Sequence, residues 1–317
     1  MRPALAFLAA LAAFPAFAQT APAPAAPQGP PPDLSPDSRG TGPFPAIKEA
    51  DPALPDHVVY RPEDLGALGT LKLGVVVWGN GGCAADGASA RHHLAQLASY
   101  GYLVIAPGTI RSGPGALPRE TGARRGPDTS GKLPPVATSF EDVRAGIDWA
   151  LAENARAGSR YHGRIDPAMI AVGGHSCGGL QALQLAGDPR VRTVLVHNSG
   201  IFADGSNPIS GLTVDKSLLG TLHTPVLYVL GGPSDIAYPN GTDDVRLISK
   251  VPVFLASSNV GHGGTFRQPN GGAVGMVSVA WLQWQLRGDA AAGRMFTGKN
   301  CTLCTDSTWT VARKGIE

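Results

Sequence analysis

The stretch "VGGHSCGGLQ", residues 172–181, holds a serine within a G-x-S-x-G pattern near the middle of the chain. The apolar segment before it (169–176) predicts a buried strand, and the segment after it (177–187) predicts a helix. Glycines allow a sharp turn between the two elements, and that turn would expose Ser176 at the helix N-terminus, where negative charge is favoured. The alternative is an ordinary glycine-rich turn with a capping serine. We predict that Ser176 is a nucleophile.

Short apolar segments alternate with amphipathic segments on both sides of this turn. The expected strands are 72–79, 102–108, 169–176, 191–200, 224–232 and 251–258. The expected helices are 88–101, 139–155, 177–187 and 273–289, with a serine cap before the second. This alternation predicts the α/β class, a mostly parallel central sheet with helices on both faces. In such sheets, functional residues gather in the loops at the carboxyl ends of the strands.

A serine hydroxyl is a weak nucleophile that needs a histidine base, and the base needs an acid to orient it. In serine sites built on a strand–turn–helix, the acid and then the histidine follow the serine along the chain. His197 lies within an expected strand, where a buried, hydrogen-bonded ring is the simpler interpretation. His223 lies in a loop before a strand, on the wrong side of the sheet. His262 lies in "SSNVGHGGTF" after the last expected strand, and we predict that it is the base.

The acid is sought in the loops that follow the later strands. Asp235 lies in "VLGGPSDIAYPNG", directly after the strand 224–232, and we predict that it orients His262. Asp204 follows the strand that ends near residue 200 and is the main rival. The remaining competitors are Asp215, Asp243 and Asp244, of which the last two are interpreted as surface charges in a helical stretch.

A serine nucleophile also requires two backbone N–H groups that stabilise the developing oxyanion. One is expected from Cys177, the residue after the nucleophile, and the other from the loop after an earlier strand. The segment "VVVWGNGGC" (75–83) fits that loop, with Asn80 as the expected donor and Gly79 as the alternative. An ordinary glycine turn remains the other interpretation of this segment.

At this point the chain resembles an α/β-hydrolase of the dienelactone-hydrolase-like group, which includes bacterial cutinase-like and polyester-hydrolase-like enzymes. The pieces that carry the resemblance are "WGNGGC", "GHSCGG", "GGPSDIAYPNG" and "NVGHGGTF", and the similar region spans about residues 57–290. The resemblance implies the α/β-hydrolase fold and hydrolysis of a small-molecule or polymeric carboxylic ester through an acyl-enzyme, with no cofactor. Cys177 stands where cutinase-like enzymes usually have methionine, and the tail 298–315 is unlike that group.

Two other functions remain as alternatives. One is a serine peptidase of the prolyl-oligopeptidase type, although the chain has no propeller or other large extra domain. The other is a non-catalytic binding protein that retains the fold, against which the complete serine, aspartate and histidine set argues.

Four cysteines, an even number, favour disulfides in an oxidising compartment, and sequence alone allows three pairings. In the expected fold the loops around Cys83 and Cys177 come together, and we hypothesise that their disulfide fixes the oxyanion loop. Cys301 and Cys304 form C-x-x-C, which we interpret as a local disulfide. One such pair cannot complete a four-ligand zinc site, so no metal is expected.

The N-terminus resembles a secretory signal, with Arg2 followed by an apolar run that ends in a small-x-small pattern. We expect a signal peptide over 1–18, cut after Ala18, and a Pro/Ala-rich linker over 19–45. The catalytic domain is expected over 46–290, with a C-terminal tail over 291–317. The mature protein would be periplasmic or secreted and soluble, without a membrane anchor; its oligomeric state is left open.

The formal net charge of +2 gives no case for nucleic-acid binding. Trp78, Ile201 and Phe202 lie near the expected site and are candidates for substrate contact, although core packing is the stronger interpretation of Trp78. The basic stretch "RETGARR" (119–125) could attract an anionic substrate but is more often a solvated loop. His92 and His93 lack the spacing of a metal pair and are interpreted as a surface position and a helix flank.

Overall fold

The computed structural model describes residues 35–117 and 135–317. This part of the chain forms a mixed, mostly parallel nine-stranded sheet with helices packed against it, so the predicted α/β class is confirmed. The expected signal peptide (1–18) and the basic stretch 119–125 lie outside the described residues.

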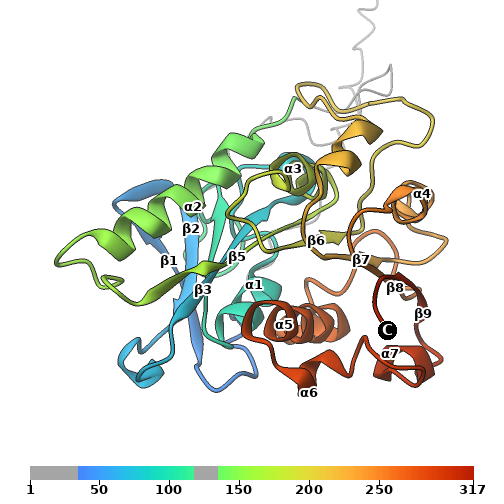
Figure 1. Ribbon diagram of the computed structural model, residues 1–317. Coiled ribbons are helices and arrows are strands. Elements are labelled where there is room, and N and C mark those ends of the chain that lie inside the picture. The colour runs from blue at the N-terminus through green and yellow to red at the C-terminus, as the bar shows by residue number, and fades with distance from the viewer. Residues whose placement is uncertain (1–34, 118–134) are drawn as a thin grey trace, which may run out of the picture. The chain divides into compact units, whose positions relative to one another are not determined.

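The sheet has a parallel centre and antiparallel margins. Its strands are β1 (Ala46–Asp51), β2 (Leu54–Pro62), β3 (Leu73–Gly79), β4 (Tyr102–Pro107), β5 (Ile165–His175), β6 (Thr193–His197), β7 (Val226–Leu230), β8 (Val253–Ser257) and β9 (Thr310–Lys314). Across the sheet they follow the order β1-β2-β4-β3-β5-β6-β7-β8-β9 (Figure 1). Neighbours from β4 to β8 pair in parallel, and the pairs β1–β2, β2–β4 and β8–β9 are antiparallel.

The six expected strands are the six parallel strands, whereas β1, β2 and β9 were not predicted. The parallel strands are covered on both faces and therefore appear in the sequence as continuous apolar runs. The outermost strands β1 (AIKEAD) and β9 (TVARK) mix charged with apolar residues and keep part of their surface in water. Strand β2 (LPDHVVYRP) contains two prolines and an aspartate. Proline cannot donate a hydrogen bond to a neighbouring strand, so this sequence does not predict a strand.

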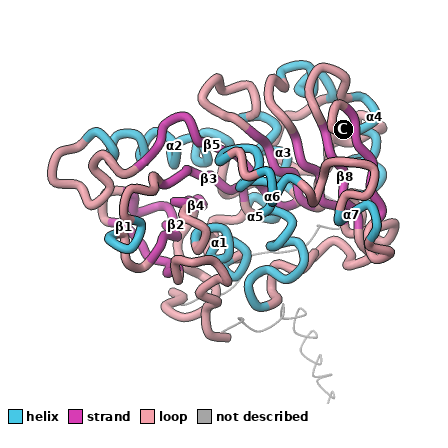
Figure 2. The backbone as a smooth tube through the Cα atoms, turned by 60° about the horizontal axis from the view of Figure 1, so that its bottom comes forward, coloured by secondary structure: helices cyan, strands magenta, loops and turns pink. Residues whose placement is uncertain are grey.

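Helices cover both faces of the sheet (Figures 1 and 2). They are α1 (Arg91–Ala98), α2 (Phe140–Ala155), α3 (Cys177–Leu185), α4 (Tyr238–Leu247), α5 (Gly272–Arg287), α6 (Ala290–Gly293) and α7 (Thr302–Thr305). One apolar cluster joins the sheet to α2, α3 and α4, and a second cluster joins its other face to α1 and α5. The sheet is therefore buried between two helical layers.

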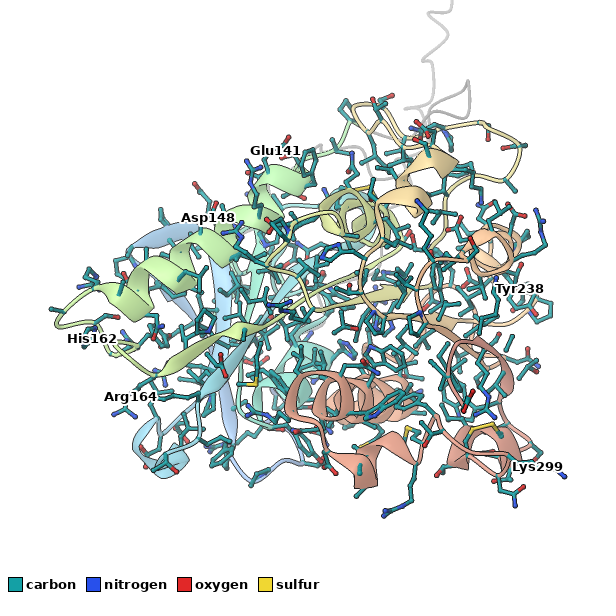
Figure 3. All side chains as sticks on the ribbon, viewed as in Figure 1. Glu141, Asp148, His162, Arg164, Tyr238 and Lys299 are labelled. Carbon is teal, nitrogen blue, oxygen red and sulfur yellow. A yellow bond between two sulfur atoms is a disulfide. The ribbon has the colours of Figure 1, made fainter. Side chains whose placement is uncertain are left out.

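Helix α2 begins at the predicted serine cap. The Ser139 hydroxyl accepts a hydrogen bond from the Asp142 amide, and the Asp142 carboxylate accepts one from the Ser139 amide, which together form a capping box. Glu141 and Asp148 lie on the outer side of the helix, away from the sheet (Figure 3). The amphipathic pattern of this segment thus corresponds to one buried and one solvated side.

The end of the expected linker, residues 35–45, is bound to helix α1. The Ser38 hydroxyl lies 2.8 Å from Nδ1 of His92, and the Thr41 amide donates to the Gln96 side-chain oxygen at 2.8 Å. Composition alone does not reveal these bonds, because the partners come from a helix about 55 residues further along the chain. Residues 35–45 therefore belong to the folded unit.

The expected C-terminal tail (291–317) also belongs to the fold. Strand β9 pairs with β8, and Cys301 forms a disulfide with Cys304, as predicted for this C-x-x-C pair. Cys301 and Ile316 are buried in the apolar cluster on the α1 and α5 face. The sheet therefore extends past the expected domain boundary at residue 290.

None of the helices in residues 35–117 and 135–317 combines the length and the apolar character needed to cross a membrane.

Candidate active site

Ser176 lies at the sharp turn between β5 and α3. Its backbone has φ 54° and ψ −123°, which is a strained conformation for a residue with a side chain. The turn is tight: a Cβ atom on Gly178 would lie 2.0 Å from the Gly79 carbonyl carbon, and one on Gly174 would lie 2.1 Å from the Gly178 oxygen. Glycine is therefore required at both places, and the predicted strand–turn–helix around Ser176 is present.

A chain of hydrogen bonds joins Ser176, His262 and Asp235. The Ser176 Oγ atom lies 2.9 Å from Nε2 of His262, and Nδ1 of the same ring lies 2.6 Å from Oδ1 of Asp235. The aspartate follows β7 and the histidine follows β8, so all three residues lie at the carboxyl ends of parallel strands. The structure thus brings together the three residues that the sequence singled out.

Asp235 is buried and has hydrogen-bond donors on both of its oxygens. Besides His262, the Ala237 amide donates to Oδ1 at 2.9 Å and the Gly231 amide donates to Oδ2 at 3.1 Å. Burial alone would raise the pKa of Asp235, but these hydrogen bonds outweigh it and lower the pKa to about 2. The carboxylate is therefore ionised at neutral pH and can orient the histidine and stabilise its protonated form.

Asn198 joins Asp235 to the loop that carries His262, and this residue was not predicted from the sequence. Its Nδ2 atom donates to Oδ2 of Asp235 at 2.9 Å and to the Gly261 carbonyl at 3.0 Å. The residue directly follows β6 and has a positive φ of 44°. Its position at the carboxyl end of a strand is the signal that could have identified it.

His175, next to Ser176, was also missed. Its Nε2 atom lies 2.8 Å from the His262 carbonyl oxygen, and because that oxygen can only accept, Nε2 must carry the proton. Burial lowers the pKa of His175 to about 4, although the bond to the carbonyl opposes that shift. A neutral His175 ring therefore supports the backbone of His262.

Asn80 and Cys177, the expected oxyanion donors, lie on segments in direct contact. The contact of Gly178 with Gly79 places the first turn of α3 against the end of β3, and a Cβ on Gly178 would lie 2.6 Å from the Asn80 nitrogen. The Asn80 side chain is buried and donates to the carbonyls of Ala84 and Pro107. Within the described chain, no hydrogen bond occupies the Asn80 or Cys177 amide.

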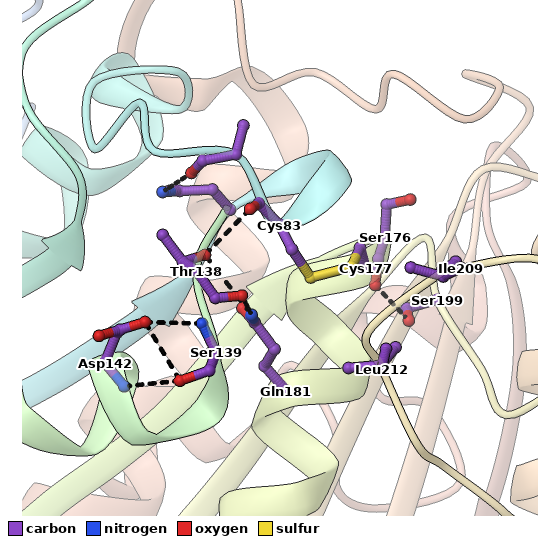
Figure 4. The surroundings of a disulfide bond; sticks show 12 residues. Cys83, Thr138, Ser139, Asp142, Ser176, Cys177, Gln181, Ser199, Ile209 and Leu212 are labelled. Atoms are coloured by element: carbon purple, nitrogen blue, oxygen red, sulfur yellow. Dashed lines mark hydrogen bonds between the residues drawn. A yellow bond between two sulfur atoms is a disulfide. The ribbon is translucent and has the colours of Figure 1, made fainter. Parts of the chain in front are cut away.

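A disulfide links the same two segments. Cys83, at the end of the short helix η2 (Gly81–Cys83), is bonded to Cys177, with Cα atoms 5.3 Å apart (Figure 4). The Cys83 carbonyl accepts hydrogen bonds from the amide and hydroxyl of Thr138. The predicted pairing is present, and it joins the loop after β3 to the residue that follows Ser176.

A cavity of about 480 Å³ opens beside Ser176 and His262. Its described lining is mostly apolar and includes Leu180, Phe202, Ala203, Pro208, Ile209, Ile236, Ala237 and Pro239. Phe202 lines it, as proposed from the sequence, whereas Ile201 is buried beneath and Trp78 is packed in the core on the other face of the sheet.

In the described chain, none of the rival acids is hydrogen-bonded to His262, whose Nδ1 atom lies against Asp235. Asp204 is exposed at the cavity and Asp215 caps the short helix η3 (Lys216–Thr221), while Asp243 pairs with Arg246. Asp244 is fully buried, so its interpretation as a surface charge is wrong. It bonds to groups from three other segments, which no local sequence pattern reveals.

The helix α1 histidines are buried, which corrects their interpretation as a surface position and a helix flank. His92 is 4% exposed and His93 is fully buried. The His93 ring lies 5.1 Å from both Trp78 and Phe266, measured between ring centroids. His197 packs in the same cluster and is buried and hydrogen-bonded, as predicted. These aromatic contacts come from distant segments, so the helical pattern alone could not show them.

Within the described residues, no group of three or more His, Cys, Asp or Glu side chains is arranged to hold a metal ion. A comparison with protein families gives no matching family model, and a comparison with curated proteins gives no match. The function proposed below therefore depends on the geometry of this chain.

The buried His93 ring makes folding sensitive to acid. Burial lowers the pKa of His93 from 6.5 to about 3, so near pH 5 the unfolded chain binds a proton that the folded protein excludes. This group alone should make the free energy of unfolding about 2 kcal/mol smaller at pH 5 than at pH 7. We expect H93F to remove that share of the pH dependence in urea unfolding.

The control is H223F, which changes an exposed histidine and should retain the wild-type pH dependence. Equal pH dependence in H93F and wild type would show that His93 does not carry this linkage.

Proposed function

We propose that this chain is a serine carboxylic-ester hydrolase with an α/β-hydrolase fold. The observation that carries the proposal is the hydrogen-bonded chain from Ser176 through His262 to Asp235, with the serine on a strained strand–helix turn. The order serine, acid, histidine along a mostly parallel sheet agrees with that fold. The resemblance of the four sequence motifs to dienelactone-hydrolase-like and cutinase-like enzymes points to the same chemistry.

In the proposed reaction, His262 Nε2 takes the hydroxyl proton as Ser176 Oγ attacks the ester carbonyl carbon. The tetrahedral intermediate collapses to an acyl-enzyme, and the alcohol leaves with the proton held by His262. Water then attacks the acyl carbon while His262 takes its proton. Release of the carboxylic acid returns that proton to Ser176, and Asp235 stabilises the charged imidazole throughout.

The oxyanion would be held by the backbone amides of Asn80 and Cys177. Both lie beside the nucleophile on segments that pack against each other, and neither donates to another group in the described chain. Such donors act on the charge that develops in the transition state, so their positions affect kcat more than KM. We propose that the Cys83–Cys177 disulfide keeps these donors in register.

The described cavity lining favours an uncharged ester with apolar groups. The described lining contains two ionisable side chains, His262 and Asp204. No lysine or arginine belongs to this described lining. An acyl group carrying a carboxylate would therefore meet an acid and no described counter-charge. Small esters, plant-derived esters and polyesters all fit this description. The two disulfides agree with a periplasmic or secreted location.

The direct test is hydrolysis of p-nitrophenyl butyrate. S176A should lower kcat/KM by at least about a thousandfold, because it removes the hydroxyl that is hydrogen-bonded to His262 Nε2. S258A changes a serine in the loop before His262 that does not belong to the cavity lining, and it should retain the wild-type rate. Undiminished turnover by S176A, or cleavage only of prolyl peptides in a parallel assay, would overturn the proposal.

The two disulfides provide a matched comparison. The double variant C83A/C177A should reduce kcat about tenfold or more with little change in KM, because loosened oxyanion donors weaken transition-state binding. C301A/C304A removes a disulfide far from the cavity lining and should leave kcat unchanged, even where it lowers the melting temperature. An equal kcat in both double variants would contradict the proposed role of the Cys83–Cys177 bond.

A further inference from the structure

One wall of the cavity is formed by an irregular segment, residues 201–215, between β6 and η3. It contributes Phe202, Ala203, Asp204, Ser206, Pro208 and Ile209 to the lining. Because the segment contains no helix or strand, its position depends on bonds to neighbouring elements.

Helix α4 holds the beginning of this wall segment. The Ile201 amide donates to Oδ2 of Asp244 at 2.8 Å, and the Ala203 amide donates to the Asn240 side-chain oxygen at 3.1 Å. Asn240 and Asp244 are four residues apart and therefore lie on the same side of the helix. Two successive anchors thus fix the backbone on either side of Phe202.

The same carboxylate holds the far end. Lys216, the residue directly after the wall segment, places its Nζ atom 2.6 Å from Oδ1 of Asp244 and 2.9 Å from Oδ2 of Asp243. The Tyr228 hydroxyl, from β7, donates to Oδ2 of Asp244 at 3.2 Å. One buried side chain therefore binds both ends of the segment to the sheet and to α4.

Between its ends, the wall segment makes two further hydrogen bonds to neighbouring elements in the described chain. The Val136 amide donates to the Ser210 carbonyl, and the Gln184 side chain donates to the Thr213 carbonyl. Asp244 itself is fully buried, and a buried carboxylate is unfavourable unless donors surround it. Three donors, from the segment start, its end and β7, satisfy this requirement.

We propose that Asp244 is a positioning residue that sets the shape of the substrate cavity by holding both ends of the wall segment 201–215. Asp244 touches neither Ser176 nor His262, so it acts on the fit of the substrate and not on the chemical step. The kinetic part of this inference rests on the proposed ester hydrolysis, whereas the structural part does not.

The kinetic test compares p-nitrophenyl acetate with p-nitrophenyl octanoate. Phe202 and Ile209 line the cavity that opens beside Ser176. We therefore expect a long acyl chain to contact them, whereas an acetyl group is too short to extend along the cavity. D244N removes the charge that binds Lys216 and should raise KM for the octanoate about fivefold or more, with kcat and acetate hydrolysis nearly unchanged. D243N changes the neighbouring carboxylate, which also pairs with Lys216 but does not bind the Ile201 amide, and it should raise the KM for the octanoate clearly less than D244N does.

The pH profile provides a second readout. Burial raises the pKa of Asp244 to about 6, against the lowering effect of Lys216, so acid removes the charge that holds Lys216. The groups facing it are Lys216 of η3, Tyr228 of β7 and Asp243 on α4 itself; β8 (VFLAS) adds no titratable side chain. The octanoate-to-acetate ratio of kcat/KM should fall from pH 7 to pH 5 in wild type and stay flat in D244N.

Hydrogen exchange tests the structural part without any substrate. Amides of residues 201–205 should exchange about tenfold faster or more in D244N than in wild type and D243N, because the amide side chain offers one acceptor oxygen to the three donors that the carboxylate binds with two. If D244N fails to fold, K216Q releases the far end alone and should speed exchange over residues 210–215. Unchanged exchange in the folded variants would overturn the proposed anchoring.

Hydrogen exchange and ester kinetics together separate the possible failures. Faster exchange with an unchanged octanoate-to-acetate ratio would overturn the role of Asp244 in substrate fit. Faster exchange in a protein that hydrolyses neither ester would instead contradict the proposed function and leave the anchoring role supported.

Discussion

The close approach of helix α3 to the ends of β3 and β5 is the constraint on which the rest of the site depends. Any side chain at Gly178 would collide with the backbone of Gly79, so the helix can start where it does only because this contact is between glycines. That start forces Ser176 into its strained backbone conformation and places the Cys177 amide beside the loop after β3. The Cys83–Cys177 disulfide joins the same two segments covalently.

Hydrogen bonds between loops hold Asp235 and His262 in place beside Ser176. Asn198 links Asp235 to the backbone before His262, and His175 supports the carbonyl of His262 itself. The low pKa values of Asp235 and His175 follow from this arrangement, the first from its hydrogen-bond donors and the second from burial. At neutral pH the acid is therefore charged and the supporting ring is neutral.

The sequence predicted the parallel strands and the Ser176, Asp235 and His262 set because their signals are local: apolar runs, glycine turns and positions after strands. The outer strands β1 and β9 were missed because half-solvated strands carry no continuous apolar run. The burial of His93 and Asp244 was misjudged because their partners come from distant segments. Long-range contacts of this kind leave no pattern at helical or strand spacing.

The central claim, that Ser176 is the nucleophile activated by His262, is tested most directly with diethyl p-nitrophenyl phosphate. Attack by Ser176 Oγ on phosphorus would release one equivalent of p-nitrophenolate and leave a diethylphosphoryl group on the serine. Mass spectrometry of the digested protein should locate that group on Ser176 in wild type and find almost none in H262A. Labelling of another residue, or no labelling of a protein that still hydrolyses esters, would contradict the account.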